Sequence, residues 1–150
     1  MVLQDSDEDD VASISSLMEV TVKINSMKKK LLREKSRLQM FIRRDNLLDD
    51  VMEQIESVNP LYVRYEGEIG EDLNGLSKEL FSDFWIQFLQ RFGRGKNRFF
   101  FCLSVEKAPQ EKHLVAAGRM LILGFLLFQY IPTFINDAVL FFLLRHLLMN

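Results

Sequence analysis

The sequence has few of the residues that build covalent or metal-held scaffolds. Its 150 residues include one cysteine, Cys102, together with two histidines, three prolines and one tryptophan. A single cysteine excludes a disulfide framework within the chain and is typical of a reducing compartment. The first ten residues are acidic and lack an apolar core, so they do not form a signal peptide. We therefore expect a cytoplasmic or nuclear protein.

A strong overall charge is also absent, because the formal net charge is only −2. The charges are instead arranged in blocks. Residues 23 to 44 carry nine bases and one acid, whereas residues 45 to 90 carry eleven acids and two bases. Such blocks indicate that the basic segment pairs with an acidic surface of the same chain. The basic block contains one aromatic residue, Phe41, so it lacks the stacking that single-stranded nucleic acids favour. We predict no nucleic-acid partner.

A long apolar run is lacking as well. The stretch from Met120 to Ile135 is 16 residues long and contains Gln129 as its one strongly polar side chain. A membrane-spanning helix needs about 20 apolar residues. Arg119 before the stretch, and Asn136 and Asp137 after it, favour a buried pair of helices. The alternative is a small membrane protein with a C-terminal helical hairpin.

Apolar residues are abundant, at 48% of the chain against 27% charged, and 13 phenylalanines supply enough bulk for a core. Helical spacing recurs over most of the sequence. We predict an α+β fold that is predominantly helical, with a long N-terminal helix and short strands near residues 61–66 and 98–104. Three parts are expected: a disordered acidic tail (1–12), a basic amphipathic helix (13–40) and a folded part (41–150).

The segment from Tyr62 to Trp85 has the clearest local pattern. Its first residues are β-formers, and Gly67 and Gly70 mark a turn. From Leu76 onward the apolar residues recur every three or four positions, as on one face of a helix. These residues are Leu76, Leu80, Phe81, Phe84, Trp85, Phe88 and Leu89.

Two further segments show helical patterns of the same kind. In Phe41–Val58, Asp45 or Asn46 is expected to cap a helix whose apolar face includes Leu47, Leu48, Val51, Met52 and Ile55. In 113–133 a helix contains Gly118-Arg119 and is followed by Tyr130-Ile131-Pro132. A second helix is expected over residues 136–148, and Gly118 and Gly124 permit close helix packing.

These three segments, in this order, resemble the opening of a HECT-type ubiquitin ligase domain. In that family a short element ending in arginines precedes a helix, as Phe41-Ile-Arg-Arg44 does here. A strand, an acidic Gly-Glu turn and an Asp-x-Gly-Gly bend follow, corresponding to residues 62–75, with Asn74 in place of one glycine. The resemblance covers about residues 41–148 and corresponds to the first part of the larger, N-terminal lobe, hence a partial HECT N-lobe.

The resemblance implies a family reaction in which ubiquitin is transferred through a cysteine thioester. The family's catalytic cysteine lies in a smaller C-terminal lobe, and Cys102 does not match it. We expect a HECT-like fragment that is inactive alone and whose partners are ubiquitin-pathway proteins. The alternative is a non-catalytic protein-interaction module that uses the basic helix as its contact element.

Residues that could carry other chemistry are better explained by structure. The acidic cluster Glu66, Glu68, Glu71 and Asp72 has no histidine or cysteine to complete a metal site, and such turns are usually solvated. In the glycine-rich loop 91–98, Gly95-Lys96 is followed by asparagine, not by the Ser/Thr of a phosphate-binding loop.

Cys102 sits in an apolar run, and His113 and His146 are the two histidines that could activate it. Neither histidine lies in a recognisable catalytic motif, so a buried structural thiol is the better interpretation. Ser6 precedes four acids, which resembles a casein-kinase-type acceptor site, but such short motifs are common by chance and a plain solvated tail is the better interpretation. We predict no catalytic, cofactor-binding or metal-binding residues and no cofactor.

Self-association is expected through the C-terminal helices. In the HECT family, later parts of the lobe cover the helices that correspond to residues 113–128 and 136–148. Without that cover, large apolar side chains stay in water, which favours association. The expected exposed residues are Leu121, Phe125, Phe128, Phe134, Phe141, Phe142 and Leu144.

Overall fold

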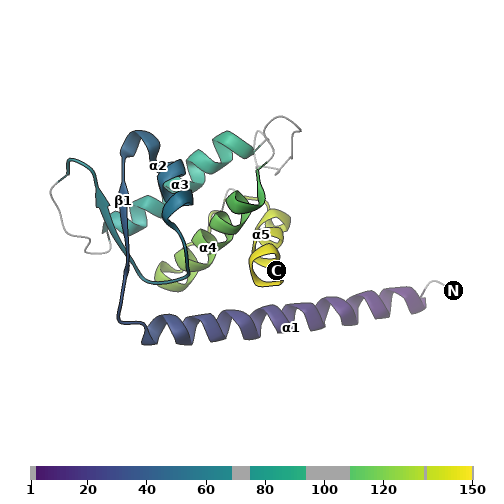
Figure 1. The fold of residues 1–150 in the computed structure, drawn as a ribbon. Coiled ribbons are helices and arrows are strands. Elements are labelled where there is room, and N and C mark those ends of the chain that lie inside the picture. Colours follow the sequence, from purple (N-terminus) through teal and green to yellow (C-terminus); the bar gives the residue numbers. More distant parts are fainter. Residues whose placement is uncertain (1–2, 69–74, 94–108, 134, 150) are drawn as a thin grey trace. The chain divides into compact units, whose positions relative to one another are not determined.

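The computed structural model describes residues 3–68, 75–93, 109–133 and 135–149 (Figure 1). Their elements are α1 (Leu3–Arg33), β1 (Leu38–Ile42), the short 3-10 helix η1 (Arg44–Asn46), α2 (Leu47–Gln54), β2 (Leu61–Tyr65), α3 (Gly75–Phe92), α4 (Glu111–Phe128) and α5 (Asp137–Met149). The chain divides into two compact units, Met1–Arg33 and Glu34–Asn150. The fold is α+β and predominantly helical, as predicted.

Helix α1 makes up the first unit and differs from the predicted helix at both ends. It begins at Leu3, so it includes most of the segment expected to be a disordered tail. Acidic residues are favourable near a helix N-terminus because the helix dipole is positive there, an effect that the composition of the segment does not reveal. The helix ends at Arg33 instead of continuing to residue 40. Just after it, the Ser36 hydroxyl donates a 2.7 Å bond to the Glu34 carboxylate, a local bond that competes with helix.

A parallel β-α-β unit opens the second unit. Strands β1 and β2 pair in parallel, with Leu38 opposite Leu61 and Ile42 opposite Tyr65, and α2 lies between them in sequence. One face of the sheet is buried, and it is formed by Met40, Ile42, Leu61, Val63 and Tyr65. The prediction of a strand near 61–66 is confirmed. Strand β1 was not predicted, and the strand predicted near 98–104 lies outside the described residues.

Helix α3 supplies the largest side chains of the core. Phe84 and Trp85 are fully buried and meet edge to face, with ring centroids 5.1 Å apart, and Phe88 stacks on Phe84 at 5.6 Å. The helix packs against both α2 and β2. The helical spacing that begins at Leu76 therefore predicted this element and its buried face correctly.

Helices α4 and α5 lie against each other, and α4 also contacts α2 and α3 (Figure 1). The two predicted glycine contacts are present. A Cβ on Gly118 would lie 3.0 Å from the Cβ of Leu147 on α5, and one on Gly124 would lie 3.2 Å from the Phe81 ring. Both glycines thus allow α4 to approach its neighbours closely. Among the described residues, no helix is long and apolar enough to cross a membrane.

The side chains expected to be exposed on α4 and α5 have different outcomes, and two of them, Phe128 and Leu144, are only partly exposed. Phe125, Phe141 and Phe142 are exposed, as predicted. Leu121 is buried, so its prediction is wrong, because α4 turns that side chain toward the core of its own unit. Phe134 lies outside the described residues. Self-association itself stays a prediction.

Candidate functional site

The site begins where the chain leaves β1 and enters α2. Asp50, in the first turn of α2, is 4% exposed and accepts four hydrogen bonds. Arg43 donates three of them, from its backbone nitrogen (2.9 Å), Nε (3.2 Å) and Nη2 (2.8 Å). The fourth comes from Asn46 Nδ2 at 3.0 Å. Asn46 is the N-cap residue of α2, as predicted. Its side chain bonds Asp50, however, and makes no hydrogen bond to the backbone of the helix end.

These bonds keep Asp50 ionised. The hydrogen bond from the Arg43 side chain is the main cause that lowers the pKa of Asp50, and burial of the carboxylate opposes it. The same interaction raises the pKa of Arg43. A buried, charged carboxylate is stable here because charged donors occupy its oxygens. The turn between β1 and α2 is thereby fixed.

The neighbouring arginine, Arg44, joins three separate elements. Its Nε and Nη2 bond the two carboxylate oxygens of Glu68, after β2, at 2.6 and 2.9 Å. Its Nη1 bonds Glu79, on α3, at 2.9 Å, and its guanidinium lies 4.2 Å from the centre of the Tyr65 ring. We call Arg44, Tyr65, Glu68 and Glu79 the Arg44 cluster. The guanidinium of Arg44 therefore contacts the carboxylates of both Glu68 and Glu79. Its hydrogen bond to Glu68 lowers the pKa of that carboxyl group.

Tyr65 forms the floor of this cluster. It is 3% exposed, and its hydroxyl has no hydrogen-bond partner among the residues that the structure describes. Burial, together with the charge of Glu79, raises its pKa, so the phenol stays neutral at physiological pH. Burial also raises the pKa of Asp83, the next acidic residue along α3. Tyr65 therefore serves as an apolar platform for the Arg44 guanidinium and not as an acid or base.

A shallow depression of about 590 Å³ opens beside the cluster, at the carboxyl ends of β1 and β2. In parallel sheets this is the end where ligands usually bind. At its rim the Gln54 amide accepts from Phe41 N at 2.8 Å and donates to Phe41 O at 2.7 Å, so it closes that edge of β1. The depression is lined by Phe41, Arg43, Asp50, Gln54, Arg64, Tyr65, Glu66, Gly67 and Glu68.

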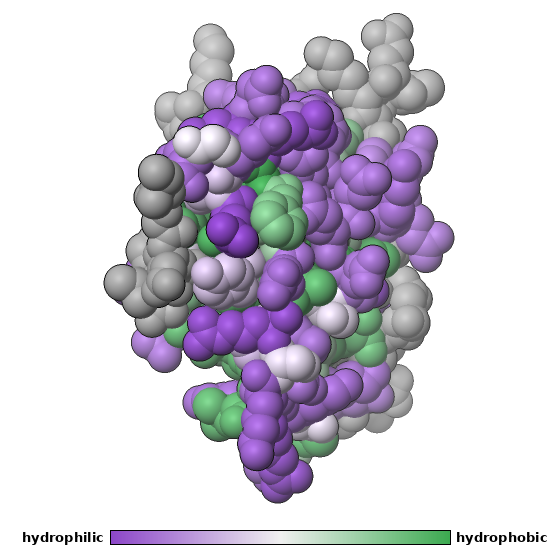
Figure 2. Space-filling model, turned by 60° about the vertical axis from the view of Figure 1, so that its left-hand side comes forward, coloured by the Kyte–Doolittle hydropathy of each residue, from purple (hydrophilic) through white to green (hydrophobic). Residues whose placement is uncertain are grey.

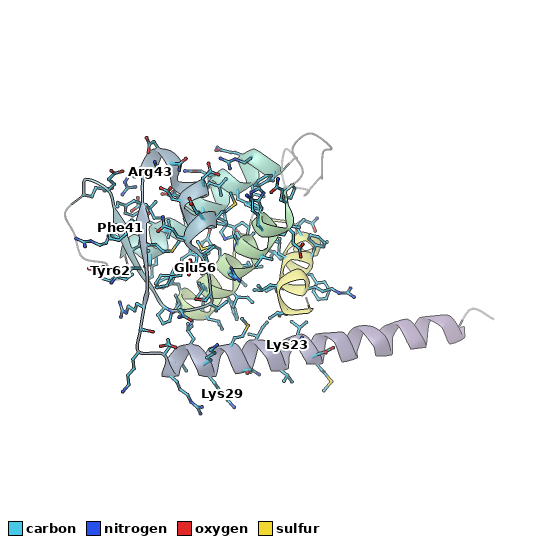
Figure 3. All side chains as sticks on the ribbon, in the orientation of Figure 1. Lys23, Lys29, Phe41, Arg43, Glu56 and Tyr62 are labelled. Carbon is cyan, nitrogen blue, oxygen red and sulfur yellow. The ribbon has the colours of Figure 1, made fainter. Side chains whose placement is uncertain are left out.

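The surface on this side is mostly hydrophilic, with small separate apolar spots (Figure 2). Phe41 is 55% exposed on β1, and the guanidinium of Arg64, its partner on β2, lies 5.8 Å from its ring centre. Figure 3 shows Phe41 on β1 and Arg43 just beyond the end of that strand, nearer α2. Asp50 and Glu68 are both paired with arginines, so neither carboxylate is free to act as a general base.

The acidic cluster predicted from the sequence is divided by the structure. Glu66 and Glu68 lie just after β2, and Glu68 pairs with Arg44. Glu71 and Asp72 lie outside the described residues. Within the described part of the chain, no group of histidine, cysteine or acidic side chains could hold a metal ion. The sequence pattern missed the partner of Glu68, because Arg44 lies 24 positions earlier.

The other candidates have local roles or fall outside the described ranges. Cys102 and residues 94–98 of the glycine-rich loop lie outside, as does the side chain of His146. Arg91, which was predicted to lie in the loop, is in the last turn of α3 and bonds Asp49 at 2.6 and 3.2 Å. His113 accepts a bond from the backbone nitrogen of Gln110 at the start of α4 (3.1 Å) and packs on Phe92. Burial lowers the pKa of His113, consistent with a neutral capping group.

Comparison with known proteins gives one informative relation. No family model matches the chain. The sequence is 32% identical over 129 residues to the E3 ubiquitin-protein ligase hecw-1 of Caenorhabditis elegans. The match covers 74% of this chain and 10% of that protein, so the chain spans about a tenth of the length of the relative it matches. It supports a ubiquitin-ligase-related origin, in agreement with the HECT resemblance.

Acidification is expected to destabilise the protein through this site. Arginine partners lower the pKa values of Asp49, Asp50 and Glu68. Their contribution is complete above the unfolded-state pKa of about 4, and it is lost as pH falls through the lower folded-state values. The raised pKa of Asp83 acts in the opposite direction, since its protonation removes a cost of burial. Urea midpoints at pH 7, 5 and 3 measure the net fall.

Asp50→Asn tests the contribution of the buried carboxylate. The variant should be less stable at pH 7 and should lose less stability between pH 5 and pH 3, because one carboxylate with a lowered pKa has been removed. Glu53→Gln is the matched control, since Glu53 is exposed on the same helix. An unchanged pH profile in Asp50→Asn would contradict the assignment.

Proposed function

We propose that residues 38–149 form the opening part of a HECT-type N-terminal lobe and contribute structure, not chemistry, to ubiquitin transfer. The Arg44 cluster is the observation that carries this proposal. The arginine pair after β1 belongs to the first segment of the HECT resemblance, and the acidic turn after β2 and the start of α3 both belong to the second. Arg44 bonds Glu68 and Glu79, so these segments meet at one side chain.

The third segment of the resemblance has a structural partner as well. Arg119 Nη1 donates a 2.8 Å bond to the backbone oxygen of Ile55, just after α2. The neighbouring Gly118 allows α5 to pack closely on α4. The Gly-Arg pair thus links α4 to both α2 and α5. The similarity to hecw-1, which is a ubiquitin-protein ligase, supports the same proposal.

We expect the 150-residue chain to form no ubiquitin thioester by itself. Such a thioester needs an activated thiolate, and the only cysteine of the sequence, Cys102, does not match the family's catalytic motif. The chain would be incubated with activating enzyme, conjugating enzymes, ubiquitin and ATP, and then analysed with and without reducing agent. An adduct that reductant removes, and that disappears in Cys102→Ser, would overturn the prediction.

A chimera tests the structural role directly. The matching segment of hecw-1 would be replaced by the corresponding residues of this chain, and ubiquitin transfer by the chimera would be measured. Retained transfer supports the proposal, because the segment must then position the rest of the lobe. A chimera carrying Arg44→Glu should lose most of that activity, whereas Lys112→Glu, at an exposed residue outside both the Arg44 cluster and the depression beside it, is the control. A folded chimera without transfer contradicts the proposal.

A non-catalytic interaction module is the second candidate. It is favoured by the exposed aromatic side chains Phe125, Phe141 and Phe142 on α4 and α5. Light scattering on the wild type and on a Phe141→Ser/Phe142→Ser variant separates an associating surface from an inert one. Ubiquitin-pathway partners and a cytoplasmic or nuclear location stay predictions from the sequence.

A further inference from the structure

A second cavity, of about 330 Å³, lies at the other end of the β-α-β unit, where β2 begins. The first turn of α3 and the last turn of α4 complete its walls. Its size is near the lower limit of small-ligand pockets, which is enough for one or two residues of a peptide. The lining residues are Arg37, Pro60, Leu61, Ser77, Lys78, Leu127 and Phe128.

The charge of this cavity is one-sided. Arg37 and Lys78 are both exposed cations, and no acid is among the lining residues that the structure describes. Neither cation forms an ion pair with another residue in the described ranges, whereas Arg43, Arg44 and Arg91 all do. The lack of ion pairs at Arg37 and Lys78 contrasts with the large number of acids nearby in the sequence, since residues 45–90 carry eleven acids and two bases. The positive N-terminus of α3 adds to the same field.

The rest of the wall is largely apolar. Leu127 and Phe128 come from the end of α4, and Pro60 and Leu61 come from the start of β2. Lys78 Nζ lies 5.6 Å from the centre of the Phe128 ring, so the cationic and apolar parts are adjacent. A free inorganic anion would satisfy the two cations and leave the apolar wall in water. A ligand that fits both parts carries a negative group next to an apolar one.

We propose that this cavity binds a carboxylate with an adjacent apolar group, as in a peptide whose last residue is leucine or phenylalanine. The guanidinium of Arg37 offers paired donors that match carboxylate geometry, and Lys78 supplies a second charge. The apolar group would contact Leu127 and Phe128. This proposal is independent of the relation to ubiquitin ligases, and it concerns the opposite end of the sheet from the Arg44 cluster.

Titration calorimetry on the full chain tests the proposal. The probes are N-acetyl-Gly-Phe with a free carboxylate, the same dipeptide as its amide, an amidated peptide with glutamate beside phenylalanine, and inorganic phosphate. We expect the free acid to bind and the amide to bind at least about tenfold more weakly, because a charged hydrogen-bond acceptor is lost. Binding of the glutamate peptide as well would identify an internal acidic side chain as a second source of the carboxylate.

Variants locate the binding. Arg37→Ala and Lys78→Ala should each weaken binding of the free acid about tenfold. Lys112→Ala is the matched control, since it removes an exposed lysine of α4 that does not line the cavity. Thermal melts establish that the variants are folded. The proposal is overturned if the free acid does not bind, if phosphate binds as tightly as the acid, or if both cavity variants bind like the wild type.

Discussion

Replacing Phe84 with alanine is expected to lower the free energy of unfolding by about 3–5 kcal/mol, the usual cost of deleting a large buried aromatic side chain. Phe84 is fully buried between Trp85 and Phe88, with ring centroids 5.1 and 5.6 Å away. A whole domain has about 5–15 kcal/mol of stability, so this single change removes a large part of it. We expect Phe84→Ala to unfold at a clearly lower urea concentration than the wild type.

The measurement is urea unfolding followed by the fluorescence of Trp85, the single tryptophan of the chain. Trp85 touches Phe84 and is fully buried, so its emission reports this part of the core. Ile86→Ala is the control, because Ile86 is 46% exposed on the same helix and should cost less than about 1.5 kcal/mol. A loss below about 1 kcal/mol in Phe84→Ala would show that α3 does not carry the core.

The helices of the second unit could be predicted because each has a local signal. Apolar residues recur every three or four positions in α3, and the apolar positions of α2 and α4 follow the same rule. Strand β2 was predictable from its β-branched and aromatic residues. Each of these signals lies within one element, so one sequence is enough to recognise it.

Features that depend on distant residues were not predictable in the same way. Strand β1 is a short, mostly apolar segment that becomes a strand because it pairs with β2. Each residue of β1 pairs with a residue 23 positions later in the sequence. Arg44 has no local feature that selects Glu68 and Glu79 as its partners, which lie 24 and 35 positions later. The family resemblance gave the order of these segments along the chain. The contacts of Arg44 with Glu68 and Glu79 can be seen only in the folded structure.

The end of α4 shows a different limit. Gln129, which follows the helix, has φ of 50°, a left-handed conformation in which glycine is the usual residue. The backbone nitrogens of Gln129 and Tyr130 bond Phe125 and Gly124 oxygens at 2.9 and 3.0 Å. These bonds satisfy the last carbonyls of the helix and offset the strain. A sequence rule that looks for glycine at this position therefore misses the helix end.

The three segments that resemble HECT domains thus contain residues that join separate elements of the fold. Arg44 holds three elements together, Arg119 links α4 to the end of α2, and Gly118 sets the approach of α5 to α4. Each role depends on geometry and not on bond-making chemistry. This is the physical reason why the proposed function is a structural contribution to a larger ligase lobe.

Replacing Gly118 with alanine is expected to destabilise the protein by about 1–3 kcal/mol, a typical cost of overpacking. Helix propensity alone predicts that the variant is more stable than the wild type, because alanine is favoured over glycine by about 1 kcal/mol inside a helix. The new Cβ would lie 3.0 Å from Leu147 Cβ and 3.1 Å from the backbone oxygen of Leu143. Neither atom moves unless α5 moves as a whole, so packing should outweigh propensity.

Gly124→Ala is the matched control on the same helix. Its Cβ would meet the Phe81 ring at 3.2 Å, and a ring can tilt by a few tenths of an ångström without displacing a helix. We therefore expect a smaller loss than at Gly118, or a small gain from propensity. Urea midpoints of the two variants provide the comparison. If Gly118→Ala is more stable than the wild type, then α5 does not pack on α4 at the observed distance, and the close helix pair inferred from Gly118 is wrong.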